Sequence, residues 1–225
     1  MTFSIAARSA ETGQFAVAVA SSSPAVAARC AYARAGVGAA TTQNVTDPRL
    51  GPRALALLAE GKSAAEACRT LQAEATHREY RQVTIVDGRG GVAHFSGTRT
   101  LGLHAAASRA NVVSAGNLLG DPGVPAAIVA AFTAAPSDTH LGDRVLAAMR
   151  AGLDAGGEAG PVRSVGLILV DRVAWPIADL RVDWHDQPLD ALEALWAVWK
   201  PQMADYVTRA LNPEAAPSYR VPGDE

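Results

Sequence analysis

Bulky and small side chains alternate along the start of the chain. Residues 2–8 and 14–21 both have a period of two, and the intervening segment 9–13 is five residues long and contains a glycine. A connection of this length and composition is typical of a β-hairpin. The pattern therefore predicts two antiparallel strands, the first of which begins one residue into the chain.

Alternation also sets which side chains share a face of the first strand. Thr2 and Ser4 fall on one face, because successive side chains of a strand point to opposite sides. With the turn centred near residue 11, Thr2 lies opposite Ala20 or Ser21. We expect a hydroxyl-bearing face at the beginning of the strand, next to small side chains.

The remaining pattern predicts blocks of strands and helices. Ser63 and Glu66 have the spacing of a capping box at the start of one helix. Blocks of hairpins and helix pairs favour an α+β fold with antiparallel sheets covered by helices over a parallel doubly wound sheet. Residues 24–35 have no clear period. We expect strands at residues 36–43, 81–87, 92–95, 111–115, 165–170 and 177–182, and helices at 53–60, 64–74, 122–134, 141–153 and 189–199.

Composition narrows the class of protein. The chain is 49% hydrophobic and 19% charged, with a net charge of -2 and a pI near 6.2. These values are ordinary for a soluble globular protein and offer no basic surface for nucleic acid or for a membrane. No apolar run is long enough to span a bilayer, and Arg8 and Glu11 interrupt the place where a signal peptide would be apolar. We expect a cytoplasmic protein.

Length and punctuation predict the domain organisation. A chain of 225 residues can form one domain with a substantial core. We expect this domain to cover residues 1–211, followed by a proline-rich tail without structure of its own at 212–225. Cys30 and Cys68 are too few for a disulfide framework. Nothing in the sequence indicates a cofactor.

Thr2 carries the most specific chemistry in the chain. If Met1 is removed, Thr2 has a free α-amine close to its own hydroxyl group. The amine has a reference pKa of about 7.7–8.0, so part of it is neutral at physiological pH and can accept the hydroxyl proton. Threonine with a free amine is a known activated nucleophile. The alternative is a chain that starts with Met-Thr for no catalytic reason.

A series of segments along the chain resembles a known family. The chain is similar to the N-terminal-nucleophile hydrolase superfamily and, more closely, to family 1028 of the domains of unknown function. The resemblance covers about residues 2 to 200. The matching segments are TFSIAAR (2–8), TGQFAVAVASSS (12–23), ARAGVGAATTQ (33–43), DPRLGPRALALLAEGKSAAEA (47–67), REYRQVTIVDGRGGVAHFSG (78–97), GNLLGDPGV (116–124) and DLRVDWHDQPLDALEAL (179–195).

This resemblance implies a fold and an activity. The fold is a four-layer α-β-β-α sandwich, and the activity is hydrolysis of an amide bond with Thr2 as nucleophile. We expect a small non-peptide amide or ureido substrate. A basic residue near the amine lowers its pKa in related enzymes, whereas this chain has Ser22 next to Ser21. Ser21 either orients the amine of Thr2 or only ends the strand.

Further polar residues are candidates for the same site. Asn117 follows a predicted strand and either donates to the oxyanion or forms a turn. Gln43 ends another strand and either holds substrate or is an edge side chain. Arg34 and Arg81 are candidates for binding a substrate carboxylate, with surface charge as the alternative. His94 either contacts substrate or is a structural histidine in a strand.

Other roles are supported less specifically. Asp183 and His185 would share a strand face, but no third ligand follows at a recognisable spacing, so we expect no metal. Trp196 and Trp199 form an apolar helix stripe, which either faces a second copy of the chain or packs on its own sheet. The alternative to a hydrolase is a non-catalytic module that binds a small molecule or a partner on the same fold.

Overall fold

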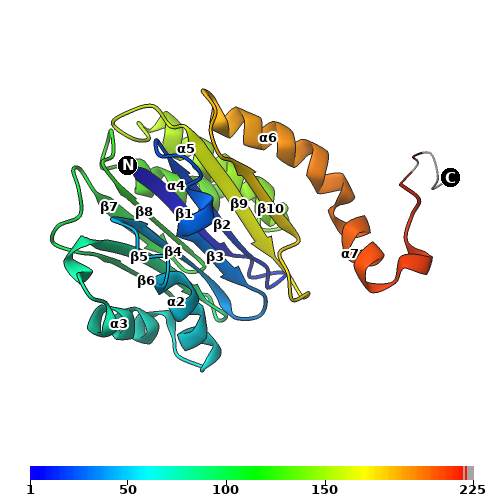
Figure 1. Ribbon diagram of the computed structural model, residues 1–225, viewed down its shortest axis with the longest axis horizontal. Helices are drawn as coiled ribbons and strands as arrows, with labels where there is room; N and C mark the ends of the chain where they lie inside the picture. The colour runs from blue at the N-terminus through cyan, green and yellow to red at the C-terminus, as the bar shows by residue number, and fades with distance from the viewer. Residues whose placement is uncertain (220, 222–225) are drawn as a thin grey trace.

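The computed structural model describes residues 1–219 and 221, and in this part the chain forms two antiparallel sheets (Figure 1). β1 is at the centre of the larger sheet, between β2 and β8. The larger sheet has six strands in the spatial order β10 (Ala178–Val182), β9 (Ser164–Val170), β2 (Phe15–Ser21), β1 (Thr2–Arg8), β8 (Val112–Asn117) and β7 (Ala105–Arg109). The smaller has four, in the order β3 (Ala31–Arg34), β4 (Gly38–Asn44), β5 (Arg81–Asp87) and β6 (Val92–Ser96).

Helices cover the outer faces of both sheets. One apolar cluster joins the six-stranded sheet to α4, α5 and α6, another joins the four-stranded sheet to α2 and α3, and a third lies between the sheets. This arrangement confirms the expected α+β fold with four α-β-β-α layers. The α-helices are α1 (Ala27–Cys30), α2 (Leu50–Ala59), α3 (Ala64–Glu74), α4 (Val124–Ala134), α5 (Leu141–Asp154), α6 (Pro188–Trp199) and α7 (Met203–Leu211); the 3-10 helices are η1 (Arg78–Tyr80), η2 (Lys200–Gln202) and η3 (Pro213–Ala215).

The first hairpin forms with the predicted register. Phe3 pairs with Ala20, which puts Thr2 beside Ser21 at the end of the hairpin. Phe3 and Ile5 are buried in the cluster under α4 and α5, where each side chain contributes about 1.5–3 kcal/mol by leaving water. Their burial fixes the opposite face of β1 toward the four-stranded sheet.

The space between the sheets changes from apolar to polar along its length. At one end Ala6, Val17 and Val86 belong to one apolar cluster. At the other end the buried residues are polar: Thr2, Ser4, Ser21, Thr41, Gln43, Gln82, Thr84, Asn117 and Ser164. Because a buried polar group is costly without a partner, this end must be organised by hydrogen bonds.

Two segments differ from the expectations because small residues give little pattern. Residues 24–35, expected to be irregular, contain α1 and β3, and the alanine-rich strand β7 was not expected at all. β8 extends to Asn117, which is therefore in a strand and not in a turn. The capping box of Ser63 and Glu66 at the start of α3 is confirmed.

The carboxyl-terminal region contains more structure than expected. α7 follows α6, and η3 lies inside the predicted tail. Arg209 of α7 donates to the carbonyl oxygen of Pro217 at 3.0 Å and lies 3.9 Å from the ring centre of Tyr219. Within the described residues this part of the tail packs on α7, while residues 220 and 222–225 of the predicted tail lie outside them.

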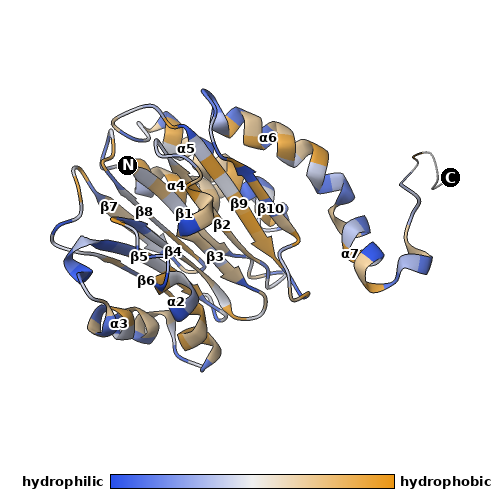
Figure 2. Cartoon of the chain, viewed as in Figure 1, coloured by the Kyte–Doolittle hydropathy of each residue, from blue (hydrophilic) through white to orange (hydrophobic). Residues whose placement is uncertain are grey.

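The tryptophan stripe of α6 packs on its own domain. Trp196 is buried and donates to Asp143 of α5 at 2.7 Å, and Trp199 donates to the carbonyl oxygen of Ile177 at 3.0 Å. Figure 2 shows that apolar and polar residues alternate along this helix. It also shows that strand β9 is strongly apolar. Across residues 1–219 and 221, no helix combines the length and the hydrophobicity needed to cross a membrane.

Candidate active site at the start of β1

Thr2 is the first residue of the central strand and is almost fully buried. It pairs with Asn117 of β8 on one side and lies beside Ser21 of β2 on the other. The residue is 6% exposed, whereas the preceding Met1 is 37% exposed. Main-chain pairing on both sides therefore fixes the position of Thr2, and Met1 covers it.

Two hydroxyl groups converge on the carbonyl oxygen of Met1. The hydroxyl of Thr2 donates to this oxygen, and the hydroxyl of Ser21 donates to it at 2.5 Å. The nucleophile candidate thus lies against a carbonyl group whose oxygen has a second donor. This is the arrangement that polarises a carbonyl group toward attack.

A positive charge is connected to these hydroxyls. The hydroxyl oxygens of Ser21 and Ser23 are 2.7 Å apart, and Arg29 of α1 donates to Ser23 at 2.8 Å. Arg29 is also held by the carbonyl oxygens of Pro24 and Ala25, at 2.7 and 3.0 Å. Arg29 thus connects a positive charge to Ser21 through Ser23.

Three amide side chains form the buried centre of the site. The side-chain oxygen of Gln82 on β5 accepts hydrogen bonds from the side-chain amide nitrogens of Gln43 on β4, at 2.7 Å, and of Asn117, at 3.1 Å. Gln82 donates in turn to Ser96 at 2.9 Å and to the carbonyl oxygen of Gly116 at 3.0 Å. This network joins the two sheets directly behind Thr2.

The network leaves acceptors without partners. The side-chain oxygens of Gln43 and Asn117 are both buried and without a hydrogen-bond partner. The amide nitrogen of Asn117, expected to donate to an oxyanion, is directed to Gln82. Besides Thr2 itself, Ser21 donates to the carbonyl oxygen of Met1.

Glu158 is a site residue that the sequence analysis missed. One carboxylate oxygen accepts from the main-chain nitrogen of Ser22 at 3.0 Å, and the other is buried without a partner. Burial raises the pKa of Glu158 to about 7, against the opposing effects of the Ser22 N–H and of the positive α-amine at the start of the chain. In the sequence it is one acidic residue in a glycine-rich loop, and nothing there relates it to residue 2.

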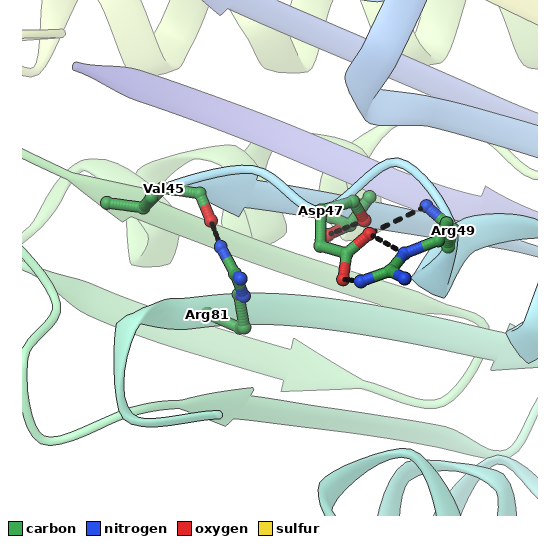
Figure 3. A network of polar contacts seen from close by, with 5 residues as sticks. Val45, Asp47, Arg49 and Arg81 are labelled. Carbon is green, nitrogen blue, oxygen red and sulfur yellow. Dashed lines mark hydrogen bonds and ion pairs between the residues drawn. The ribbon is translucent and has the colours of Figure 1, made fainter. Parts of the chain in front are cut away.

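Arg81 lies at the same end of the four-stranded sheet but outside the network. Its guanidinium donates to the carbonyl oxygen of Val45 at 2.5 Å, and its Nε atom is buried without a partner (Figure 3). The neighbouring Asp47 is held by Arg49, whose hydrogen bonds lower the pKa of the Asp47 carboxyl group. Arg81 therefore lies on the outer, helix-covered face of β5, away from the face that carries Gln82.

Two predicted residues are not brought to Thr2. Arg34 pairs with Gly38 at the end of β4 away from Gln43, and the two ends are about 16 Å apart along an extended strand. His94 is exposed on the edge strand β6, opposite Thr84. The structure therefore gathers Thr2, Ser21, Asn117 and Gln43, and leaves Arg81, Arg34 and His94 apart.

No metal-ligand cluster accompanies these residues. Asp183 and His185 follow β10 rather than sharing a strand face. In the range 1–219 and at 221, no group of three or more His, Cys, Asp or Glu side chains could hold a metal ion.

A cavity of about 210 Å³ lies on the helix side of the six-stranded sheet, on the face of β1 opposite to the Thr2 side chain. Phe3 and Ala20 form part of its wall, together with Pro161 and Val162. The side chain of Met1 packs against the neighbouring Gly160, where a Cβ atom would come within 3.1 Å of the Met1 methyl group. The cavity is therefore next to the segment that Met1 covers.

Comparison with known proteins identifies a family and a similar solved structure. A family model described as "Family of unknown function (DUF1028)" matches residues 2–192. The crystal structure of protein SPO2555 from Silicibacter pomeroyi, described as DUF1028, is 30% identical, covers 91% of this chain and 89% of that chain, and has a TM-score of 0.82. No curated protein matches the sequence.

Two other solved structures are far less similar. Anbu (ancestral beta-subunit) from Yersinia bercovieri is 11% identical, with a TM-score of 0.36 and coverage of 99% of both chains. Anbu from Hyphomicrobium sp. strain MC1 is 12% identical, with a TM-score of 0.36 and coverage of 92% of this chain and 98% of that chain. At these TM-scores the likeness says nothing about this chain.

Proposed function

The chain belongs to the family of unknown function DUF1028, as its segments predicted, and from its own site we propose that it is an amidohydrolase with Thr2 as nucleophile. Its substrate is a small non-peptide amide or ureido compound, and the active form lacks Met1. The observation that carries the proposal is the convergence of the Thr2 and Ser21 hydroxyls on one carbonyl oxygen.

The reaction begins at the amino end of the trimmed chain. The neutral α-amine of Thr2 takes the proton of the Thr2 hydroxyl, and the oxygen attacks the carbonyl carbon of the substrate. Ser21 donates to the oxygen that becomes negative, from the position in which it now donates to Met1. The protonated amine then gives its proton to the leaving nitrogen, and an ester on Thr2 remains.

Water completes the cycle. The amine, neutral again, takes a proton from a water molecule that attacks the ester, and the proton returns to the oxygen of Thr2 as the acid leaves. Arg29, connected through Ser23, lowers the pKa of the amine and so raises its neutral fraction.

The test compares three forms of the protein on a panel of small anilides and ureido compounds. The forms are a chain released so that it begins at Thr2, the same chain with Thr2→Ala, and a chain with a tag fused to Met1. We expect turnover by the first form alone, with a loss of about a hundredfold or more in the other two.

Two results would overturn the proposal. The first is equal turnover by the trimmed protein and its Thr2→Ala variant, because the hydroxyl would then have no role. The second is tight binding of an amide by both forms without cleavage, which is the behaviour of the non-catalytic binding module.

A further inference from the structure

Glu158 extends across the amino-terminal end of β1. Its main chain forms a β-bridge with Leu119, two residues beyond Asn117 of β8. Its carboxylate accepts from Ser22, one residue beyond the end of β2. Since β1 lies between β8 and β2, with neighbouring strands about 4.8 Å apart, the side chain crosses the line along which β1 would continue.

Only one oxygen of the Glu158 carboxylate accepts a hydrogen bond at this position. The oxygen that Ser22 does not use is buried without a partner, and Glu158 is only 7% exposed. A buried acceptor without a partner is uncommon and calls for a donor that binds there. The donor must come from the amino end of β1, because the carboxylate lies in its path.

We infer that Glu158 binds the α-ammonium group of Thr2 once Met1 is removed and accepts a proton from it. The inference rests on the proposed function, which requires the trimmed chain. In the step, one N–H bond of the ammonium breaks and one O–H bond forms on Glu158, leaving a neutral amine and a neutral carboxylic acid. The neutral amine is then free to take the hydroxyl proton of Thr2. Glu158 returns its proton to the amine at the end of the cycle.

Because Glu158 is buried, the transfer of a proton from the amine to its carboxylate is only slightly unfavourable. In the Met1-containing chain the pKa of Glu158 is about 7, roughly one unit below the reference value of an α-amine; if the carboxyl group keeps this pKa in the trimmed chain, the transfer is unfavourable by only about tenfold. For a glutamate with the ordinary pKa of 4.5 the same transfer would be unfavourable by about three-thousandfold. The buried position is therefore what suits Glu158 to the role.

Other charged groups near this loop already have partners. Arg29 donates to Ser23, and Arg163, which follows the loop, pairs with Asp186. Asp121, on the neighbouring loop before α4, accepts from the main-chain nitrogen of Gly123. The charged group that does act on Glu158 is the α-amine of Met1, which lowers the pKa of the carboxyl group.

The test measures the pKa of the α-amine in the trimmed protein and needs no substrate. Acetylation of the amine is followed against pH by peptide mass spectrometry, which is simple because Lys62 and Lys200 are the only lysines. The variant Glu158→Gln keeps an acceptor for Ser22 and removes the charge. The control Glu214→Gln changes an exposed glutamate on η3.

We expect Glu158→Gln to lower the pKa of the amine by about one unit or more, and Glu214→Gln to leave it unchanged. An unchanged pKa in folded Glu158→Gln protein would overturn the inference, whether or not the enzyme hydrolyses amides. If Glu158→Gln does not fold, a carbon-13 titration of the Glu158 carboxyl group replaces it. The pKa of this group must then differ between the trimmed and the Met1-containing chain, and equal values contradict the inference.

Turnover separates positioning from simple structural support. We expect Glu158→Gln to move the acidic limb of the pH profile of kcat to lower pH, by the same amount as the pKa of the amine and with little change in KM, and Glu158→Asp to restore part of this shift. A rate loss with no change in the pKa of the amine or in the pH profile would mean that Glu158 only holds Ser22. Absence of turnover in the wild type, with the amine pKa shifted as expected, would instead reject the proposed function alone.

Discussion

Replacing Glu158 by glutamine should make the stability of the Met1-containing protein less dependent on pH. Burial raises the pKa of Glu158 from 4.5 to about 7. The folded state therefore binds the proton more tightly than the unfolded state, and ionisation of Glu158 opposes folding. Below pH 4.5 Glu158 is protonated in both states and does not lower the free energy of unfolding. Between pH 4.5 and 7 the free energy of unfolding falls as the pH rises, and above pH 7 the decrease is complete.

The magnitude follows from the same values. A pKa raised from 4.5 to about 7 corresponds to about 3 kcal/mol, at about 1.4 kcal/mol for each pH unit. Glutamine is neutral throughout, so the free energy of unfolding of the variant relative to wild type should rise by about this amount between pH 4.5 and pH 8. A partner missing for the new amide group costs about 1–3 kcal/mol at every pH and leaves the difference between the two pH values unchanged.

Urea unfolding at pH 4.5, 6 and 8 measures the effect, with Glu214→Gln as the control at an exposed position. The wild type and the Glu158→Gln variant should converge toward acid pH apart from a constant offset. An offset that is the same at pH 4.5 and pH 8 would refute a buried, raised carboxyl group at this position. A similar pH effect in Glu214→Gln would assign it to the net charge of the protein instead.

Three further predictions concern the rest of the site. Gln82→Met should lower the free energy of unfolding by about 2–4 kcal/mol in urea melts, because it deprives both Gln43 and Asn117 of their acceptor; an unchanged midpoint would contradict the network. Ser21→Ala in the trimmed protein should lower kcat by about ten- to a hundredfold at similar KM, since it removes the donor to the carbonyl oxygen; a change in KM alone would count against this role. Arg29→Met should raise the pKa of the Thr2 amine and move the pH optimum upward, measured by the rate profile, whereas an optimum that stays in place would separate Arg29 from the amine.

Much of the fold could be predicted because bulky and small residues alternate clearly. The two strands and the faces of Phe3 and Thr2 follow from a period of two, and the register that puts Thr2 beside Ser21 follows from a turn centred near residue 11. The pattern fails where alanine dominates, as in β7 and in the segment of α1 and β3. Alanine gives little contrast between bulky and small positions and favours helices by propensity, so pairing with neighbouring strands overrides its own preference in β3 and β7.

Some residues of the candidate site could be predicted from the sequence and others could not. Thr2, Ser21 and Asn117 could be named because they stand at the ends of strands that the pattern reveals. Glu158 could not, since it is 136 residues from its partner Ser22 and lies in a loop without a period. Gln82 shows a second limit: it lies within a predicted strand, but its role depends on Gln43 and Asn117 from two different sheets.

Two expectations stay predictions. These are the cytoplasmic location and the assembly into a homo-oligomer, which the packing of Trp196 on its own domain does not address.

The most direct measurement of the central claim is the site of acylation by an activated ester. Trimmed protein is mixed with 4-nitrophenyl acetate, stopped with acid and mapped by tandem mass spectrometry. We predict an acetyl group on the hydroxyl of Thr2 that hydroxylamine removes, absent from both the tag-bearing chain and Thr2→Ala. Acetylation elsewhere, or equal labelling of Thr2 when Met1 is retained, would contradict a nucleophile activated by its own amine.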